Sequence, residues 1–138
     1  MKNVLYFIIA LVIIIVPIVL HSKLMPESKE LKPYDRQVAA EDSATLVFAR
    51  EISITHVNDV KKKIKTGYAK RASIKMPAGD YDFVLDYIVS GSSSKGIQQQ
   101  ITMRKGRIYE ITYSLKDNMI YTSIGEITLE RYNELFKK

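Results

Sequence analysis

The stretch Ile74-Lys-Met-Pro-Ala-Gly-Asp-Tyr-Asp-Phe-Val-Leu-Asp-Tyr-Ile-Val89 decides the fold. Its alternate residues from Tyr81 to Val89 are all aromatic or aliphatic, whereas Asp80, Asp82 and Asp86 share the opposite parity. A period of two is typical of a strand with one buried and one solvated face. The Pro77-Ala78-Gly79 segment before it predicts a tight turn.

This turn predicts a β-hairpin in which the strand ending near Lys75 pairs with the strand over 80–89. Because Ala72 and Ile74 should share a face with the aromatic residues, Lys75 is expected opposite Asp80 or Asp82. The aspartates are therefore interpreted as cross-strand partners of basic side chains. They are spread over some ~20 Å of extended chain, too far apart for a calcium loop or a glycosidase pair.

The rest of the chain after residue 43 carries the same kind of pattern. Alternation and turn residues predict strands over 44–49, 51–57, 68–75, 97–103, 108–115 and 119–124, and a short helix or turn over 128–136. The run Gly91-Ser-Ser-Ser-Lys-Gly96 predicts a flexible loop. The expected fold is all-β: an antiparallel β-sandwich or partly open barrel of about seven strands, preceded by one N-terminal transmembrane helix.

The N-terminal segment Val4–Leu20 is uncharged and almost entirely aliphatic, interrupted only by Pro17. Seventeen helical residues would extend about 25 Å, slightly less than a bilayer core. The run is longer than the apolar region of a signal peptide, and Leu20-His21-Ser22 is a poor cleavage site, so an uncleaved anchor is favoured over a cleaved signal. The expected organisation is an anchor over 1–22, a linker over 23–43 and a β-domain over 44–138.

The side of the membrane is indicated by two opposed features. Basic residues follow the apolar run, at Lys23, Lys29, Lys32 and Arg36, which by the positive-inside rule would place the domain in the cytoplasm. Long domains, however, translocate largely regardless of charge, and a short N-terminus before a first apolar run is the usual arrangement for export. We expect the domain outside the cytoplasm, held by the bilayer through residues 4–20, or secreted if the segment is cleaved.

The composition excludes several kinds of chemistry. The chain has no cysteine, so disulfides, thiolate catalysis and cysteine-bound zinc are absent. His56 is the only histidine expected in the domain, and the chain has no G-x-S-x-G nucleophile motif. We therefore predict no catalytic residue, no metal site and no cofactor.

A basic run without any acidic residue separates Val60 from Gly79, and the net charge of the chain is +6. It contains the candidate anion-binding residues Lys61, Lys62, Lys63, Lys65, Lys70 and Arg71. One interpretation is a surface for lipid headgroups, an anionic envelope polymer or a protein partner. The alternative is an edge hairpin whose solvated lysines prevent aggregation. The anchor argues against nucleic acid, and Tyr68 alone is thin support for base stacking.

Two segments carry a resemblance to a known group of domains. Met76-Pro77-Ala78-Gly79-Asp80-Tyr81, followed by Lys105-Gly106-Arg107-Ile108-Tyr109-Glu110-Ile111, resembles the small β-sandwich modules of bacterial envelope proteins, of PEGA type or transthyretin-like (carboxypeptidase regulatory-like) type. The resemblance covers roughly residues 44–115, although the small-x-Val-x-Val-Asp-Gly opening of PEGA modules is missing. It implies a non-catalytic accessory or binding module, with no catalytic residues to carry over.

The function expected from the sequence is a membrane-anchored, extracytoplasmic, non-catalytic binding or structural module of the cell envelope. One alternative is a domain that recruits an anionic partner through the basic hairpin at 61–75. A second alternative is an enzyme whose site the sequence does not reveal, which would require a pocket with converging polar groups.

Overall fold

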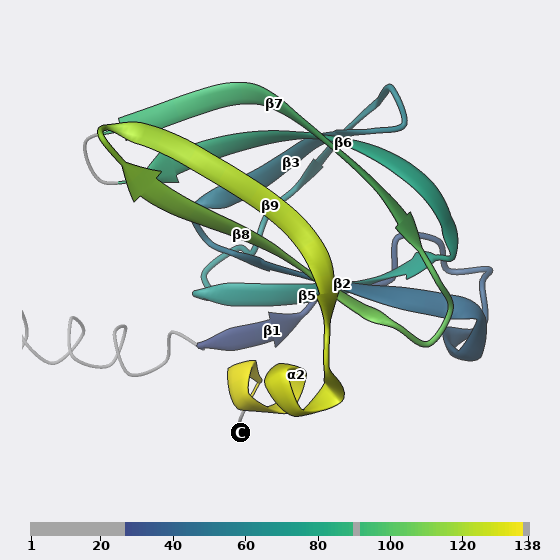
Figure 1. The fold of residues 1–138 in the computed structure, drawn as a ribbon. Coiled ribbons are helices and arrows are strands. Elements are labelled where there is room, and N and C mark those ends of the chain that lie inside the picture. The colour runs from purple at the N-terminus through teal and green to yellow at the C-terminus, as the bar shows by residue number, and fades with distance from the viewer. Residues whose placement is uncertain (1–26, 90–91, 137–138) are drawn as a thin grey trace, which may run out of the picture.

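The computed structural model describes residues 27–89 and 92–136, and within them nine strands form two sheets (Figure 1). The strands are β1 (Ser28–Glu30), β2 (Ser43–Ala49), β3 (Ile52–Val57), β4 (Val60–Ile64), β5 (Arg71–Pro77), β6 (Gly79–Val89), β7 (Ser92–Met103), β8 (Ile108–Lys116) and β9 (Met119–Ile127). A short 3-10 helix, η1 (Ala40–Asp42), precedes β2, and helix α2 (Leu129–Leu135) follows β9. One sheet has the order β1-β5-β2-β8-β9 and the other β4-β3-β6-β7.

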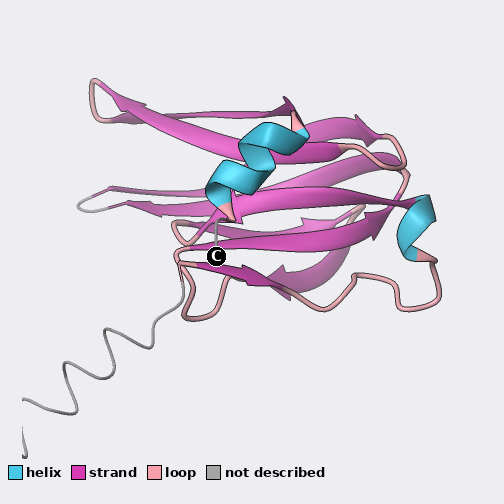
Figure 2. Ribbon diagram, turned by 90° about the horizontal axis from the view of Figure 1, so that it is seen from below, coloured by secondary structure: helices cyan, strands magenta, loops and turns pink. Residues whose placement is uncertain are grey.

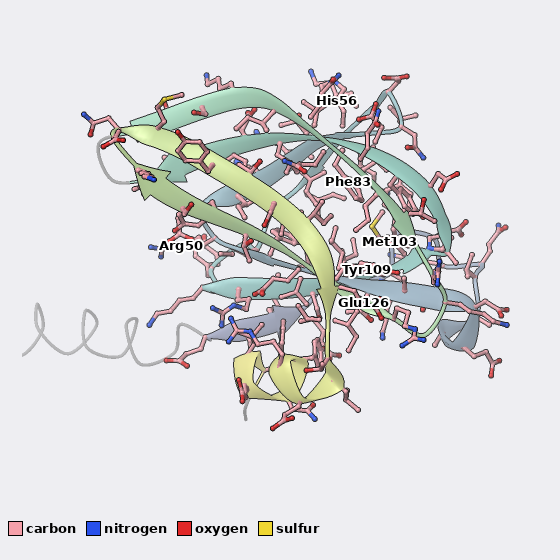
Figure 3. The ribbon with its side chains drawn as sticks, viewed as in Figure 1. Arg50, His56, Phe83, Met103, Tyr109 and Glu126 are labelled. Atoms are coloured by element: carbon pink, nitrogen blue, oxygen red, sulfur yellow. The ribbon has the colours of Figure 1, made fainter. Side chains whose placement is uncertain are left out.

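The inner faces of the two sheets meet in one apolar core (Figure 3). On β6 the alternation predicted from the sequence is confirmed, since Tyr81, Phe83, Leu85 and Tyr87 are all buried. The rings of Tyr81 and Phe83 are stacked, with their centroids 5.3 Å apart. The facing sheet contributes alternate residues of three strands: Ala44, Leu46, Phe48, Ala72, Ile74, Met76, Tyr109 and Ile111.

The turn at Pro77 connects the two sheets and is not a hairpin, so the predicted pairing of β5 with β6 is wrong. β5 pairs with β1 and β2, whereas β6 pairs with β3 and β7. Gly79 has φ = +153°, a backbone conformation that favours glycine. The Tyr81 hydroxyl donates a hydrogen bond to the Pro77 carbonyl at 2.5 Å. The turn was thus predicted at the correct residues, but it forms a corner between sheets.

The expected charge match across this turn is consequently also wrong. The ammonium of Lys75 donates to the Thr45 hydroxyl at 2.7 Å, and Asp82 lies opposite Gln100 on β7. Ala72 and Ile74 do share the core with the β6 aromatics, as the parity argument required. Parity could not identify the partner strand, because two facing sheets both turn their apolar residues toward one core.

The five-stranded sheet is mixed, whereas the four-stranded sheet is antiparallel, as predicted from the sequence. The nine described strands exceed the predicted number of about seven. β1 runs parallel to β5, and β2 runs parallel to β8. β1 belongs to the segment expected to be a linker. The Leu31 amide donates to the Ser73 carbonyl (2.8 Å) and the Tyr34 amide to the Lys75 carbonyl (2.9 Å), so this segment lies on the edge of β5.

The serine-rich segment expected to be a flexible loop is part of β7 from Ser92 onward. It pairs with the end of β6, where Tyr87 lies opposite Ser94 and Val89 opposite Ser92. The prediction of a loop over 92–96 is therefore wrong. Main-chain hydrogen bonds to the edge of β6 order this segment, and such bonds do not depend on apolar side chains.

Two tight turns use asparagine and aspartate at positive φ. Asn58 and Asp59 join β3 to β4 with φ of 49° and 65°, and Asp117 and Asn118 join β8 to β9 with φ of 53° and 62°. Paired positive φ values are typical of the type I′ turn, which suits the twist of a hairpin. Asparagine and aspartate are turn-forming residues, so both pairs are turn signals that can be read from the sequence itself.

Helix α2 covers the outer face of the five-stranded sheet (Figure 2). Val47 points outward on β2, yet it is fully buried. Its neighbours in register are Ser73 and Glu110. The Ser73 hydroxyl lies 3.4 Å from the Tyr132 hydroxyl, and Glu110 pairs with Arg131 of the helix. β2 is therefore buried on both faces.

The expected anchor at 4–20 lies outside the described residues. Among the residues that are described, no helix is both long and apolar enough to cross a bilayer. The described part of the chain begins at Glu27, directly before β1.

Candidate functional site

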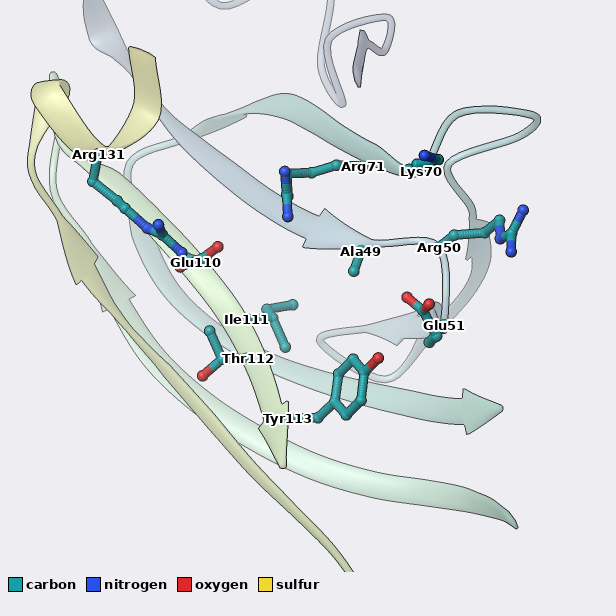
Figure 4. A pocket seen from close by; sticks show the side chains of 10 residues that line it. All are labelled: Ala49, Arg50, Glu51, Lys70, Arg71, Glu110, Ile111, Thr112, Tyr113 and Arg131. Carbon is teal, nitrogen blue, oxygen red and sulfur yellow. Dashed lines mark ion pairs between the residues drawn. The ribbon is translucent and has the colours of Figure 1, made fainter. Parts of the chain in front are cut away.

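A cleft opens where β2 and β8 separate. The two strands pair over three positions, from Thr45–Val47 against Ile108–Glu110, and beyond Glu110 β8 pairs with β9 alone. The diverging strands leave a cleft of about 560 Å³ (Figure 4), a volume in the range of small-ligand sites. It is lined by Ala49, Arg50, Glu51, Lys70, Arg71, Glu110, Ile111, Thr112, Tyr113 and Arg131.

The cationic side chains of the cleft differ in what they bind. Arg131 is already paired, with Glu110 and with Glu134, each at 3.8 Å. Arg50 and Arg71 form no ion pair with any residue in 27–89 or 92–136. Figure 4 shows the guanidinium of Arg71 turned into the cleft and that of Arg50 turned away. Since arginine does not deprotonate in proteins, Arg71 gives the cleft a permanent positive charge.

Tyr113 lies across the cleft from Arg71, and its hydroxyl is directed toward Glu51 (Figure 4). Its ring meets the buried Tyr87 ring edge-on, at a centroid distance of 6.0 Å. Burial, together with the negative charge of Glu51, raises the pKa of Tyr113. The hydroxyl therefore stays neutral at physiological pH and is able both to donate and to accept a hydrogen bond.

The six candidate anion-binding residues do not form one cluster. Lys61, Lys62 and Lys63 lie on β4, an edge strand of the four-stranded sheet. The ammonium of Lys62 stands over the Tyr34 ring, 4.0 Å from its centroid. The ammonium of Lys70 lies 3.8 Å from the carboxylate of the exposed Glu27. Arg71 lines the cleft.

Lys65 follows β4 and is exposed. Arg71 is thus the one candidate residue whose charged group points into the cleft. Sequence reasoning missed Glu51, Tyr113 and Arg131, because they belong to elements far apart in the chain that only the non-local pairing of β2 with β8 brings together.

The other chemistry considered from the sequence lies elsewhere. His56 sits on β3, with its Nδ1 3.0 Å from the Thr55 hydroxyl, and does not line the cleft. Asp80 accepts a hydrogen bond from the Thr102 hydroxyl at 2.5 Å. Among the described residues, no group of three or more histidine, cysteine or acidic side chains is placed to hold a metal ion.

Comparisons of the chain with protein-family models, with curated proteins and with solved structures each gave no match. A function therefore has to be inferred from the chemistry of the cleft and from the chain itself.

Proposed function

We propose that the chain is a membrane-anchored, extracytoplasmic and non-catalytic binding module of a cell envelope, and that its cleft binds a carboxylate carried on an extended peptide. The anchoring rests on the uncharged run over residues 4–20. The resemblance of the turn at Met76–Tyr81 to small envelope modules supports the same location. The observation that carries the binding function is the guanidinium of Arg71 inside the cleft, which has no ion-pair partner in the described part of the chain.

The chemistry of Arg71 favours a carboxylate ligand. A guanidinium presents two parallel N–H donors that match the two oxygens of a carboxylate. Arg71 is half-buried, so water screens its charge less than on an open surface. An anion that enters the cleft would gain a charge-assisted hydrogen bond there without displacing an existing ion pair.

The strand edges beside Arg71 favour an extended peptide as the carrier of that carboxylate. From Ile111 to Lys116, β8 pairs with β9 on one side and with no described strand on the other. A free strand edge offers main-chain donors and acceptors to an added strand, which is a common way of recognising extended peptides. Tyr113 lies on this stretch and offers its neutral hydroxyl as a further polar contact.

The same groups favour binding over catalysis. General acid–base catalysis needs a group that exchanges protons near the operating pH. Arg71 stays protonated, and the raised pKa of Tyr113 keeps its hydroxyl neutral. Both groups therefore bind and orient a ligand.

Binding of a probe peptide tests this function. The full-length chain in nanodiscs is titrated with an acetylated hexaglutamate peptide, and the dissociation constant is measured by calorimetry. Arg71→Gln is expected to weaken binding about 10- to 100-fold, the effect of losing a hydrogen bond to a charged group. Arg104→Gln, which makes the same charge change on the exposed β7–β8 turn, is the matched control.

Two results would contradict the proposed ligand. Equal affinities of the Arg71→Gln and Arg104→Gln proteins would show that the peptide binds elsewhere or by net charge alone. Binding of inorganic phosphate at this site, with no binding of the peptide, would replace the carboxylate peptide by a phosphate-bearing ligand.

The β4 edge is the runner-up binding surface. Lys61 and Lys63 are exposed and form no ion pair with the described residues. Replacing Lys61, Lys62, Lys63 and Lys65 together by glutamine should then weaken low-salt binding to anionic liposomes or polymers. Unchanged binding at low salt would leave these lysines as solvated edge residues.

Protease accessibility tests the side of the membrane. If the domain is extracytoplasmic, protease added to spheroplasts should digest it, whereas it should be protected in intact cells. Protection of the domain in spheroplasts would place it in the cytoplasm.

A further inference from the structure

Three chain segments reach the same end of the domain, which we call the proximal end. Figures 1 and 2 show the start of β1, the end of β6 and the turn between β8 and β9 on the same side of the molecule. The described chain enters the domain there, at Glu27. The β3–β4 turn lies at the opposite end (Figure 1).

The tip of the β8–β9 hairpin at this end is apolar and exposed. Leu115, Met119 and Tyr121 are 47%, 60% and 49% exposed. Ser114 lies opposite Tyr121 and Lys116 opposite Met119, so Met119 and Tyr121 share one face of the hairpin and Leu115 lies on the other. An isolated exposed apolar residue needs no explanation, but three within seven positions, on both faces of one turn, form a local apolar surface.

Basic side chains accompany this apolar tip. Lys116 belongs to it, beside Asp117. Arg50, Lys65 and Lys70 lie on the turns that follow β2 and β4 at the same end, where Glu51 also lies and Lys70 pairs with Glu27. The four basic side chains are exposed, and Arg50 and Lys65 form no ion pair with the described residues. Lysine and arginine near apolar side chains suit an anionic lipid surface, because their charged groups reach the headgroups while apolar groups lie deeper. Tyrosine is enriched at this depth.

The length of the chain before Glu27 limits how far this end can be from a bilayer. Only residues 21–26 separate the apolar run 4–20 from the described chain. Six residues, even when fully extended, span no more than about 20 Å. A domain tethered this closely, and entered from its proximal end, would present that end to the membrane.

We propose that the proximal end rests on an anionic lipid surface, with the β8–β9 tip inserted among the headgroups. This inference rests on the proposed anchoring through residues 4–20 and adds a second contact that fixes the orientation of the domain. The nine residues of β8 extend about 30 Å, so the β3–β4 turn at the opposite end would stand well clear of the bilayer.

The absence of tryptophan from the chain allows a single fluorescent reporter at each end. Tyr121→Trp places it on the tip, and Val60→Trp, at a residue 59% exposed beside the β3–β4 turn, is the matched control. The full-length proteins are reconstituted in nanodiscs that contain phosphatidylglycerol and lipids brominated near the headgroup. Tyr121→Trp is expected to show quenched and blue-shifted emission, and Val60→Trp unquenched emission.

A second change links the quenching to charge and apolar contact. Lys116→Glu combined with Met119→Gln in the Tyr121→Trp protein should reduce the quenching, because it removes the cation and an apolar group from the tip. Met119→Trp is a second reporter in case the Tyr121→Trp protein does not fold.

Flotation of the full-length protein with liposomes at alkaline pH separates this inference from the proposed anchoring. A protein that floats but shows no quenching at Tyr121→Trp or Met119→Trp would overturn the surface contact and leave the anchor intact. Equal quenching at Val60→Trp and Tyr121→Trp would overturn the proposed orientation. A protein that does not float would overturn the anchoring and this inference together.

Discussion

Asn58 offers a sharp test of how the β3–β4 hairpin is held on β6. It occupies the first position of a type I′ turn at φ = 49°. Its side-chain oxygen accepts a hydrogen bond from the Asp82 amide at 2.8 Å, and its own amide donates to the Asp82 carbonyl at 2.9 Å. Its side-chain amide lies 3.4 Å from the Asp80 carbonyl, a contact too long to contribute much.

These contacts predict different costs for two substitutions. Asn58→Gly keeps the positive φ and the main-chain bond to Asp82 but removes the side-chain oxygen that accepts from the Asp82 amide. The free energy of unfolding should therefore fall by about 1 kcal/mol. Asn58→Ala also forces a residue with a Cβ into the left-handed region, which adds about 1–2 kcal/mol. The expected total loss for alanine is therefore about 2–3 kcal/mol.

The second hairpin supplies a position-matched control. Asp117 occupies the same turn position at φ = 53°, and its side chain makes no hydrogen bond to the described residues. Asp117→Gly should change the free energy of unfolding by less than about 0.5 kcal/mol. Urea unfolding of the full-length proteins in detergent, followed by circular dichroism, measures all three. Equal stabilities of Asn58→Gly and Asp117→Gly would refute the role of the Asp82 bond.

Three further perturbations have expected outcomes. Phe83→Ala removes a fully buried ring and should lower the free energy of unfolding by about 3–5 kcal/mol. Val84→Ala, on the opposite face of β6, should lower it by less than about 1.5 kcal/mol. Equal losses in urea unfolding would contradict the alternation of buried and exposed residues along β6. Burial raises the pKa values of Tyr81 and Tyr87 to about 12. The stability that the two neutral hydroxyls contribute is therefore complete below pH 10 and is lost as the pH rises toward 12. Alkaline unfolding that is unchanged by Tyr81→Phe would disprove the contribution of Tyr81. Thr128→Ala removes the hydroxyl that caps α2 by accepting a hydrogen bond from the Arg131 amide at 3.1 Å, and it should destabilise the helix by about 1 kcal/mol. The expected result is faster hydrogen exchange over 129–135. Unchanged exchange would show that the cap is dispensable.

Local patterns predicted seven of the nine described strands, whereas β1, β4 and the start of β7 lie outside the predicted ranges. The alternation over 80–89 places the buried residues of β6 correctly, and the asparagine and aspartate pairs mark both type I′ turns. These features depend on side chains a few residues apart. A single sequence contains that information directly.

The pairing of strands could not be predicted in the same way. Parity requires only that Ile74 and Phe83 reach one core, which neighbouring strands and facing sheets both satisfy. The parallel pairing of β2 with β8, which creates the cleft, joins residues more than 60 positions apart. The serine-rich start of β7 and the short β1 are ordered by main-chain bonds to the edges of β6 and β5. Such bonds do not require a pattern of apolar side chains, so the sequence does not reveal them.

The basic run shows the same limit for the candidate site. Lys61, Lys62, Lys63, Lys65, Lys70 and Arg71 are close together in the chain, but the fold separates their side chains. Three lie on the edge strand β4, where Lys62 stands over the Tyr34 ring, whereas Arg71 lines the cleft. The surroundings of Arg71 come from β2, β8 and α2, whose approach depends on the complete fold.

The way in which β1 joins the sheet also has a mechanical consequence. β1 begins at the proximal end and runs away from it beside β5, and main-chain bonds fix the chain from the Glu27 carbonyl to the Tyr34 amide. A pulling force on the N-terminal segment would act along the axis of β1. Since ladder bonds lie across the strands, the force would load them together in shear and would not open them one by one. A load applied at the start of β1 would therefore meet the geometry in which a strand best resists separation from its neighbour.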